Sequence, residues 1–160
     1  MRAARALLGD GPSLYTAVAD AAADRPVLGY HMPVISSPGL PVDQLETLPI
    51  QGIKDSSLDP RRLLAELDIL DGRVITGVNS LLSYAWPLGC AGALGAMANV
   101  EPELCIAAFA GDVTAQHRLA RIERSALEGF PLGLKRLLHV QAGTSVELGP
   151  GTGTLAGQVA

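Results

Sequence analysis

Residues 48–57, Leu-Pro-Ile-Gln-Gly-Ile-Lys-Asp-Ser-Ser, join a short apolar run to a group of small polar residues. We expect a buried strand that ends at Lys54 and is followed by a helix. An amine at the mouth of a parallel β/α fold, walled by Ile53 and neighbouring strands, is poorly solvated. We therefore expect its pKa to fall and the amine to become a nucleophile toward carbonyl groups. The alternative is a strand-end lysine whose ammonium reaches solvent, which describes most lysines.

The rest of the chain alternates short apolar runs with helical patterns. Pro60 follows Asp59, which has the position of an N-cap, and the apolar face of the helix beyond it ends at Asp71-Gly72. Apolar strands that alternate with helices are typical of βαβ units and a parallel sheet covered on both faces. The expected strands are Val27–Tyr30, Leu48–Lys54, Arg73–Gly77 and Ala91–Met97, and the expected helices are Leu14–Ala23, Val42–Thr47, a helix after Asp59, Ser80–Leu88 and the region from Pro102 onward.

Length and composition exclude several classes of protein. With 160 residues the chain has the size of one domain, and a net charge of −4 with scattered basic residues and few aromatics predicts no nucleic-acid partner. No apolar stretch reaches the roughly 18 residues of a membrane span, and Asp10 and Pro12 interrupt the region where a signal peptide would be apolar. We therefore expect a cytoplasmic protein without a membrane partner. Cys90 and Cys105 lack flanking ligand pairs, so we expect small buried hydrophobes and no metal site.

Several motifs at the expected strand ends occur together in one order. They are Tyr30-His-Met-Pro33, Gly52-Ile-Lys-Asp-Ser-Ser57, Ile75-Thr-Gly77 and the glycine-rich run 92–100 followed by Pro102. This pattern closely resembles the C-terminal half of the dihydrodipicolinate synthase/N-acetylneuraminate lyase family, over about residues 14–143. The resemblance implies a partial (β/α)₈ TIM barrel of about four C-terminal βα units followed by C-terminal helices. The chain would then divide into this region, residues 1–143, and a Gly/Thr-rich tail at residues 144–160, whose composition predicts flexibility.

The resemblance assigns roles to four residues. Lys54 matches the lysine that forms a Schiff base with pyruvate or a related 2-keto acid, and Tyr30 matches the tyrosine that relays protons to and from the carbinolamine. Gly77 resembles a glycine that lets substrate approach the backbone, and Leu94 falls where an apolar residue contacts the keto acid through its main chain. For Gly77 a strand-end turn, and for Leu94 plain core packing, remain open as alternatives. Neither a metal nor an organic cofactor is implied.

Asp55 is the next residue along the chain, and we expect its side chain to point away from the pocket, because consecutive strand residues face opposite sides. Capping or turn formation is the role expected for Asp55, Ser56 and Ser57. His31 replaces an asparagine common in the family, and the sequence assigns it no role.

Two departures from the family pattern matter. The segment of the first four strands, with the Gly-Thr-Thr-Gly-Glu-type motif that binds the keto-acid carboxylate, has no counterpart in residues 1–160. A barrel of this kind needs at least about 200 residues. The synthase branch also carries an arginine five residues after the tyrosine, where this chain has Ile35. That change disfavours dihydrodipicolinate synthesis and favours another carbon-carbon or hydro-lyase of the family.

Two hypotheses therefore stay open. In the first, the chain is the catalytic half of a Schiff-base aldolase or lyase. In the second, it is a catalytically inactive truncated member or an interaction module. Because half a barrel leaves two strand edges and an inner face uncovered, we expect it to form a homo-oligomer or to associate with a complementing N-terminal half-barrel. A nucleotide-binding α/β domain is a third and weaker hypothesis, because no glycine-rich turn has the required spacing.

Overall fold

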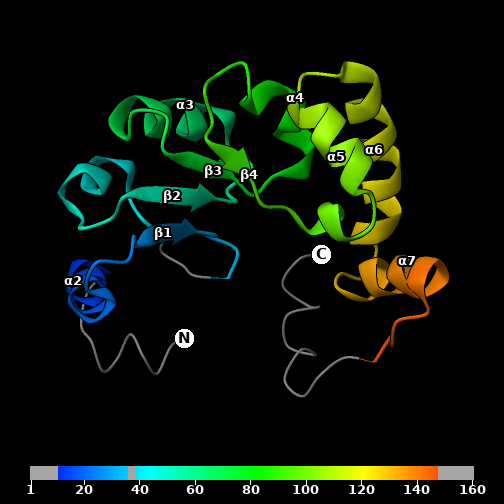
Figure 1. Ribbon diagram of the computed structural model, residues 1–160, viewed down its shortest axis with the longest axis horizontal. Coiled ribbons are helices and arrows are strands. Elements are labelled where there is room, and N and C mark those ends of the chain that lie inside the picture. Colours follow the sequence, from blue (N-terminus) through cyan, green and yellow to red (C-terminus); the bar gives the residue numbers. More distant parts are fainter. Residues whose placement is uncertain (1–10, 36–38, 148–160) are drawn as a thin grey trace. The chain divides into compact units, whose positions relative to one another are not determined.

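The computed structural model describes residues 11–35 and 39–147. Its four strands are β1 (Leu28–His31), β2 (Gly52–Asp55), β3 (Val74–Thr76) and β4 (Gly92–Ala93), hydrogen-bonded in the order β1-β2-β3-β4. This order follows the sequence, as expected for successive βα units of a parallel sheet, and it confirms the α/β fold class (Figure 1). The predicted tail at residues 144–160 consists mostly of residues 148–160, which lie outside the described residues.

The helices of the described residues lie before, between and after the strands, and most of them are short. The α-helices are α2 (Gly11–Ala22), α3 (Pro60–Ile69), α4 (Leu82–Ala85), α5 (Pro102–Phe109), α6 (Val113–Leu127) and α7 (Leu132–Ala142). Three 3₁₀ helices, η1 (Val42–Thr47), η2 (Asn79–Leu81) and η3 (Ala96–Asn99), complete the set. The expected cap of α3 is confirmed, because the Asp59 carboxylate accepts hydrogen bonds from the backbone N–H groups of Arg61 (2.9 Å) and Arg62 (3.3 Å).

Three expected boundaries were wrong. β2 begins at Gly52 rather than Leu48, because a tight turn precedes it in which the Ile50 N–H donates to the Leu48 carbonyl at 2.8 Å. The expected strand at residues 91–97 is reduced to two residues, and its second half forms η3. The helix expected to reach Leu88 ends at Ala85, and a turn over residues 86–89 follows, in which Gly89 has a φ of 92°.

The chain divides into two compact units. Among the described residues, the first unit comprises those up to Ile75 together with Gly89–Gly92, and the second comprises Thr76–Leu88 and those from Ala93 onward. Apolar side chains from β2, η1, α3 and β3 form the core of the first unit, and Ile53, Leu45, Leu63 and Val74 are each at most 1% exposed. In the second unit α6 lies beside α5 and α7 (Figure 1), and its core includes Met97, Leu119 and Ala126.

Candidate functional site

Lys54 and Tyr30 lie side by side on adjacent strands. β1 and β2 are parallel, and the register places Tyr30 directly opposite Lys54. The Lys54 ammonium nitrogen, Nζ, lies 4.3 Å from the centroid of the Tyr30 ring, which is within the range of a cation–π interaction. The two residues that the sequence predicts as nucleophile and proton relay are therefore in contact in the first unit.

The pleat of the two strands separates an open face of the sheet from a buried one. On β1, Leu28 and Tyr30 are 48% and 41% exposed, whereas the alternate residue His31 is 6% exposed. On β2, Ile53 and Asp55 are buried and Lys54 is half-buried. Because successive side chains point to opposite faces, Lys54 and Tyr30 share the open face and Asp55 points to the other one. The expectation that Asp55 points away from Lys54 is confirmed.

The hydroxyl and the backbone N–H of Tyr30 both have partners. Its hydroxyl donates a hydrogen bond to Sδ of Met32 at 2.9 Å, two residues further along the chain. Its backbone N–H donates to the hydroxyl of Tyr15, in α2, at 3.3 Å. The second bond satisfies a donor of β1 that no strand of the described sheet accepts, since β1 is at the edge of that sheet. The hydroxyl and the backbone of Tyr30 are thus both anchored, while the face of its ring contacts Lys54.

A cluster of ionisable side chains lies on the buried face behind this pair. It consists of His31 on β1, Asp55 at the end of β2, and Arg62 and Glu66 on α3. Arg62 Nε lies 3.5 Å from Asp55 Oδ1 and 2.7 Å from Glu66 Oε1, and His31 Nε2 lies 4.0 Å from Asp55 Oδ1. We call these four residues the buried charge cluster.

The protonation states of the cluster follow from burial. Loss of hydration and the Arg62 charge lower the pKa of His31, although Asp55 opposes this, so the ring is neutral near pH 7. Its Nδ1 accepts a hydrogen bond from the Leu40 N–H at 3.0 Å, which leaves the ring proton on Nε2, facing Asp55. Burial, and then the Asp55 charge, raise the pKa of Glu66 to about 7 against the opposing effect of Arg62.

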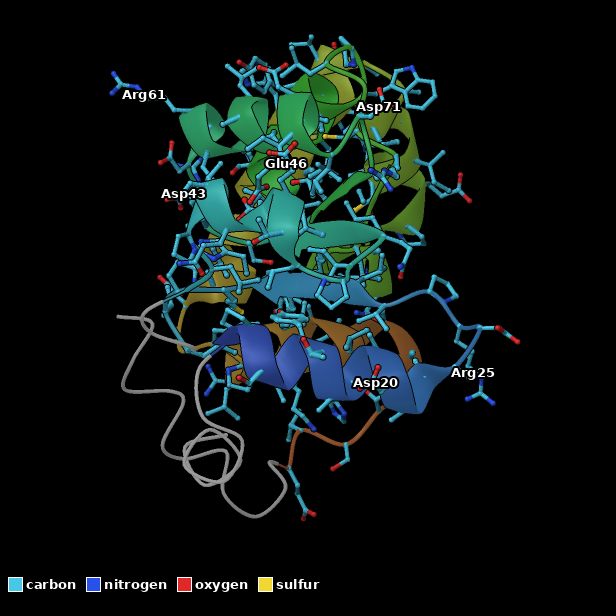
Figure 2. The ribbon with its side chains drawn as sticks, turned by 90° about the vertical axis from the view of Figure 1, so that its left-hand side faces the viewer. Asp20, Arg25, Asp43, Glu46, Arg61 and Asp71 are labelled. Atoms are coloured by element: carbon cyan, nitrogen blue, oxygen red, sulfur yellow. The ribbon has the colours of Figure 1, made fainter. Side chains whose placement is uncertain are left out.

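Sequence reasoning missed this cluster apart from the direction of Asp55. The sequence assigns no role to His31, and it gives no prediction for Arg62 or Glu66. One signal was present: Arg62 and Glu66 are four residues apart, and Glu66 lies beside Leu67 on the apolar side of α3. Figure 2 shows the contrast with Arg61, which projects outward from the same helix.

Gly77 and Leu94 belong to the second unit, in which the Leu94 N–H donates to the carbonyl of Thr76 at 2.8 Å. This bond pairs the segment after β4 with the end of β3. The alternative of core packing for Leu94 is wrong, because its side chain is 63% exposed. The substrate-binding roles of Gly77 and Leu94 stay predictions.

The described residues also allow a judgement on metal binding and on membrane-spanning helices. In the described ranges, no group of three His, Cys, Asp or Glu side chains could hold a metal ion. No helix in that same part of the chain is long and apolar enough to cross a membrane. Cys90 is 1% exposed and Cys105 is half-buried, and burial raises the pKa of both thiols.

Comparisons with known proteins point to one family. The chain is 34% identical over 134 residues to uncharacterized DapA-like lyases from two strains of Halobacterium salinarum, a match that covers 81% of this chain and 44% of each relative. The chain thus spans about half the length of the curated relatives it matches. No protein-family model matches the sequence.

Solved structures of the family share the fold. YagE, a prophage protein of the dihydrodipicolinic acid synthase family from E. coli K12 in complex with pyruvate, superimposes with a TM-score of 0.74 at 22% identity. The match covers 91% of this chain and 57% of that one. Dihydrodipicolinate synthase from Acinetobacter baumannii complexed with pyruvate gives a TM-score of 0.69 at 27% identity, covering 91% and 56%.

Proposed function

Given that this chain belongs, over the half that it spans, to the dihydrodipicolinate synthase/N-acetylneuraminate lyase family, we propose that it serves a Schiff-base aldolase or lyase acting on pyruvate or a related 2-keto acid. The observation that supports this function best is the contact of Lys54 with Tyr30 on the open face of the sheet. Imine formation requires an amine nucleophile and a proton donor, and Lys54 and Tyr30 can supply these two groups from adjacent strands.

In the proposed reaction, the neutral amine of Lys54 attacks the carbonyl carbon of the keto acid and forms a carbinolamine. Tyr30 transfers a proton to the hydroxyl group, which leaves as water as the protonated imine forms. The hydroxyl group on the far side of the carbon-carbon bond then gives its proton to the Tyr30 phenolate, its carbon leaves as an aldehyde, and the imine accepts the electron pair of the bond that breaks. The resulting enamine takes up a proton from Tyr30 at the carbon where the bond broke. Hydrolysis of the imine releases the product keto acid and restores Lys54.

Ile35 narrows the proposed substrate. It ends a turn after β1, in which its N–H donates to the Met32 carbonyl at 3.1 Å. An apolar side chain at this place cannot pair with the carboxylate of an aldehyde substrate as the expected arginine would. We therefore place the activity with lyases or aldolases of the family other than dihydrodipicolinate synthase, and we propose a cytoplasmic location.

The exposed side chains of β1 support a proposal about partners. Leu28 and Tyr30 lie about half exposed at the sheet edge beside Lys54, so the proposed nucleophile is not enclosed by the described residues. We propose that a complementing N-terminal half-barrel, or a second copy of the chain, covers this face. Light scattering of the chain, alone and mixed with such a half, distinguishes the two arrangements.

The same exposure favours a second candidate, a catalytically inactive member or interaction module. A Schiff-base lysine works best where water is excluded, and an open pair would lack that protection. This candidate predicts a folded chain, alone or with its partner, that forms no adduct with any keto acid of a panel.

Borohydride trapping decides between the two candidates. The sequence contains only two lysines, Lys54 and Lys135, so Lys135 serves as an internal control. With pyruvate and borohydride, peptide mapping should find the reduced adduct on Lys54 and not on Lys135. Lys54→Arg keeps the charge but should abolish trapping, whereas Lys135→Arg should leave it unchanged. An unmodified Lys54 peptide at saturating keto acid would contradict the proposed function.

A further inference from the structure

The buried charge cluster lies directly behind the pair of residues to which we assign the chemistry. His31 follows Tyr30 on β1 and Asp55 follows Lys54 on β2, and the register pairs His31 with Asp55 as it pairs Tyr30 with Lys54. The Ser56 N–H, just beyond β2, donates to the His31 carbonyl at 2.8 Å. Tyr30 and Lys54 are therefore each the direct neighbour, along the chain, of a residue in the buried charge cluster.

The Asp55 carboxylate is held by three separate segments. Its Oδ2 accepts a hydrogen bond from the Ser57 hydroxyl at 2.8 Å, and both oxygens lie 3.3 Å from the Ser57 backbone nitrogen. Arg62 approaches it from the first turn of α3 at 3.5 Å, and His31 approaches it from β1 at 4.0 Å. The side chain of Asp55 is only 4% exposed, so these contacts replace most of its hydration.

Turn formation by itself does not account for a buried charge. A neutral side-chain oxygen could accept the same two bonds from Ser57, and an aspartate is costly to bury unless it has a cationic partner. Arg62 is that partner, and its own side chain is 12% exposed. The ion pair therefore fixes the end of β2 against α3, at a point where a shift of one residue would turn Lys54 to the opposite face.

We propose that Asp55, paired with Arg62, is a positioning residue that holds the Lys54 amine against the Tyr30 ring. Asp55 touches neither substrate nor amine, and acts by fixing the direction in which β2 presents the next side chain. The catalytic meaning of this role rests on the proposed function. The positioning itself can be measured without any keto acid.

The contact of Lys54 with an aromatic ring provides a spectroscopic test. Reductive methylation with ¹³C-formaldehyde labels both lysines of the full chain and keeps their positive charge. The ring current of Tyr30 should shift the methyl resonance of Lys54 upfield of that of Lys135, whose Nζ donates to the carbonyl of Glu147. Tyr30→Leu should remove that shift and so identify the resonance of the unstacked lysine.

Asp55→Asn retains the acceptor for Ser57 and removes the charge. We expect it to move the Lys54 resonance at least halfway toward the unstacked position. Ser57→Ala is the matched control, because it removes the 2.8 Å bond and keeps the ion pair, and it should leave most of the shift in place. If Asp55→Asn does not fold, Arg62→Met breaks the same pair from α3, with the outward-pointing Arg61→Met as its control.

Wild-type resonance positions in folded Asp55→Asn and Arg62→Met would overturn the proposal, as would an equal loss of shift in Ser57→Ala. Trapping is measured in parallel. Where wild-type Lys54 forms the adduct, Asp55→Asn should slow its formation about tenfold or more at saturating pyruvate. If wild-type Lys54 forms no adduct, the proposed function fails, and the resonance positions still decide whether Asp55 positions the amine.

Discussion

The hydroxyl of Tyr30 donates to Sδ of Met32 at 2.9 Å, while the face of the same ring lies 4.3 Å from Nζ of Lys54. In the proposed reaction this hydroxyl has to leave the sulfur before it can exchange a proton with a carbinolamine. Met32 thus competes with the proposed proton relay. A thioether is a weak acceptor, so the competition is modest.

Met32→Leu is expected to raise the rate of adduct formation on Lys54 by about two- to fivefold. This factor corresponds to removal of a hydrogen bond with a net free energy of about 0.5–1 kcal/mol. Borohydride trapping at several pyruvate concentrations measures it. A rate equal to that of wild type, in a variant with an unchanged unfolding midpoint, would show that the Met32 bond does not restrain the phenol.

Tyr30→Phe keeps the ring beside Lys54 and removes only the hydroxyl. If the phenol relays protons, trapping should slow by about 10²-fold or more, which is the usual contribution of a positioned acid or base. The cation–π contact should persist, so the methyl resonance of labelled Lys54 should stay in its shifted position. Slow trapping with a lost shift would instead indicate that the ring had moved and that the rate reports displacement.

The parallel sheet and the place of Lys54 at a strand end followed from local sequence signals, whereas the pairing of Lys54 with Tyr30 came from the resemblance to the family. An apolar run that ends in a polar residue marks a strand end, and parallel strands bring such ends to one edge of the sheet. The opposite directions of Lys54 and Asp55 followed from the pleat alone. These inferences need only the period of a strand, which the sequence displays directly.

The buried charge cluster could not be predicted in this way. Whether Arg62 or Arg61 turns inward depends on how α3 packs against the sheet, and both follow the same N-cap and Pro60. The short length of β4 likewise depends on tertiary contacts, since residues 91–97 have the apolar composition of a longer strand. Gly77 and Leu94 were assigned by resemblance, and the structure leaves their roles as predictions.

Gly52 precedes Lys54 by two residues and has little space around its Cα atom. A Cβ atom there would lie 2.6 Å from the Arg73 carbonyl oxygen and 3.3 Å from Leu28 Cδ2. Gly52→Ala should therefore push apart β2 and the start of β3, lowering the free energy of unfolding by about 1–3 kcal/mol. Urea denaturation measures this change.

Gly92→Ala is the matched control for this substitution. It lies in β4 of the same sheet, and an added Cβ would meet no atom within 4 Å. We expect it to change the free energy of unfolding by no more than about 0.5 kcal/mol. Equal effects of the two substitutions would contradict the steric explanation for Gly52.

Glu66 makes stability depend on pH in a direction opposite to that of most carboxylates. Its pKa in the folded chain is raised to about 7 from 4.5, so the folded state binds more protons than the unfolded state between these values. The contribution of Glu66 to the free energy of unfolding is fully present below pH 4.5. It decreases by up to about 3 kcal/mol as pH rises toward 7. His31 acts in the other sense: its lowered folded pKa removes stability as pH falls below 6.5.

Glu66→Gln separates the contribution of Glu66 to stability from that of His31, because glutamine resembles the protonated acid and does not titrate. Relative to wild type, the variant should gain stability progressively as pH rises from 4.5 to 7, and the two free energies should converge at the acid end of that range. Urea denaturation across this range measures the difference. Asp55, Arg62 and Cys90 adjoin Glu66 and are unchanged in the variant. A constant difference between the two free energies of unfolding from pH 4.5 to 7 would contradict the prediction, because it would mean that Glu66 is ionised over that whole range.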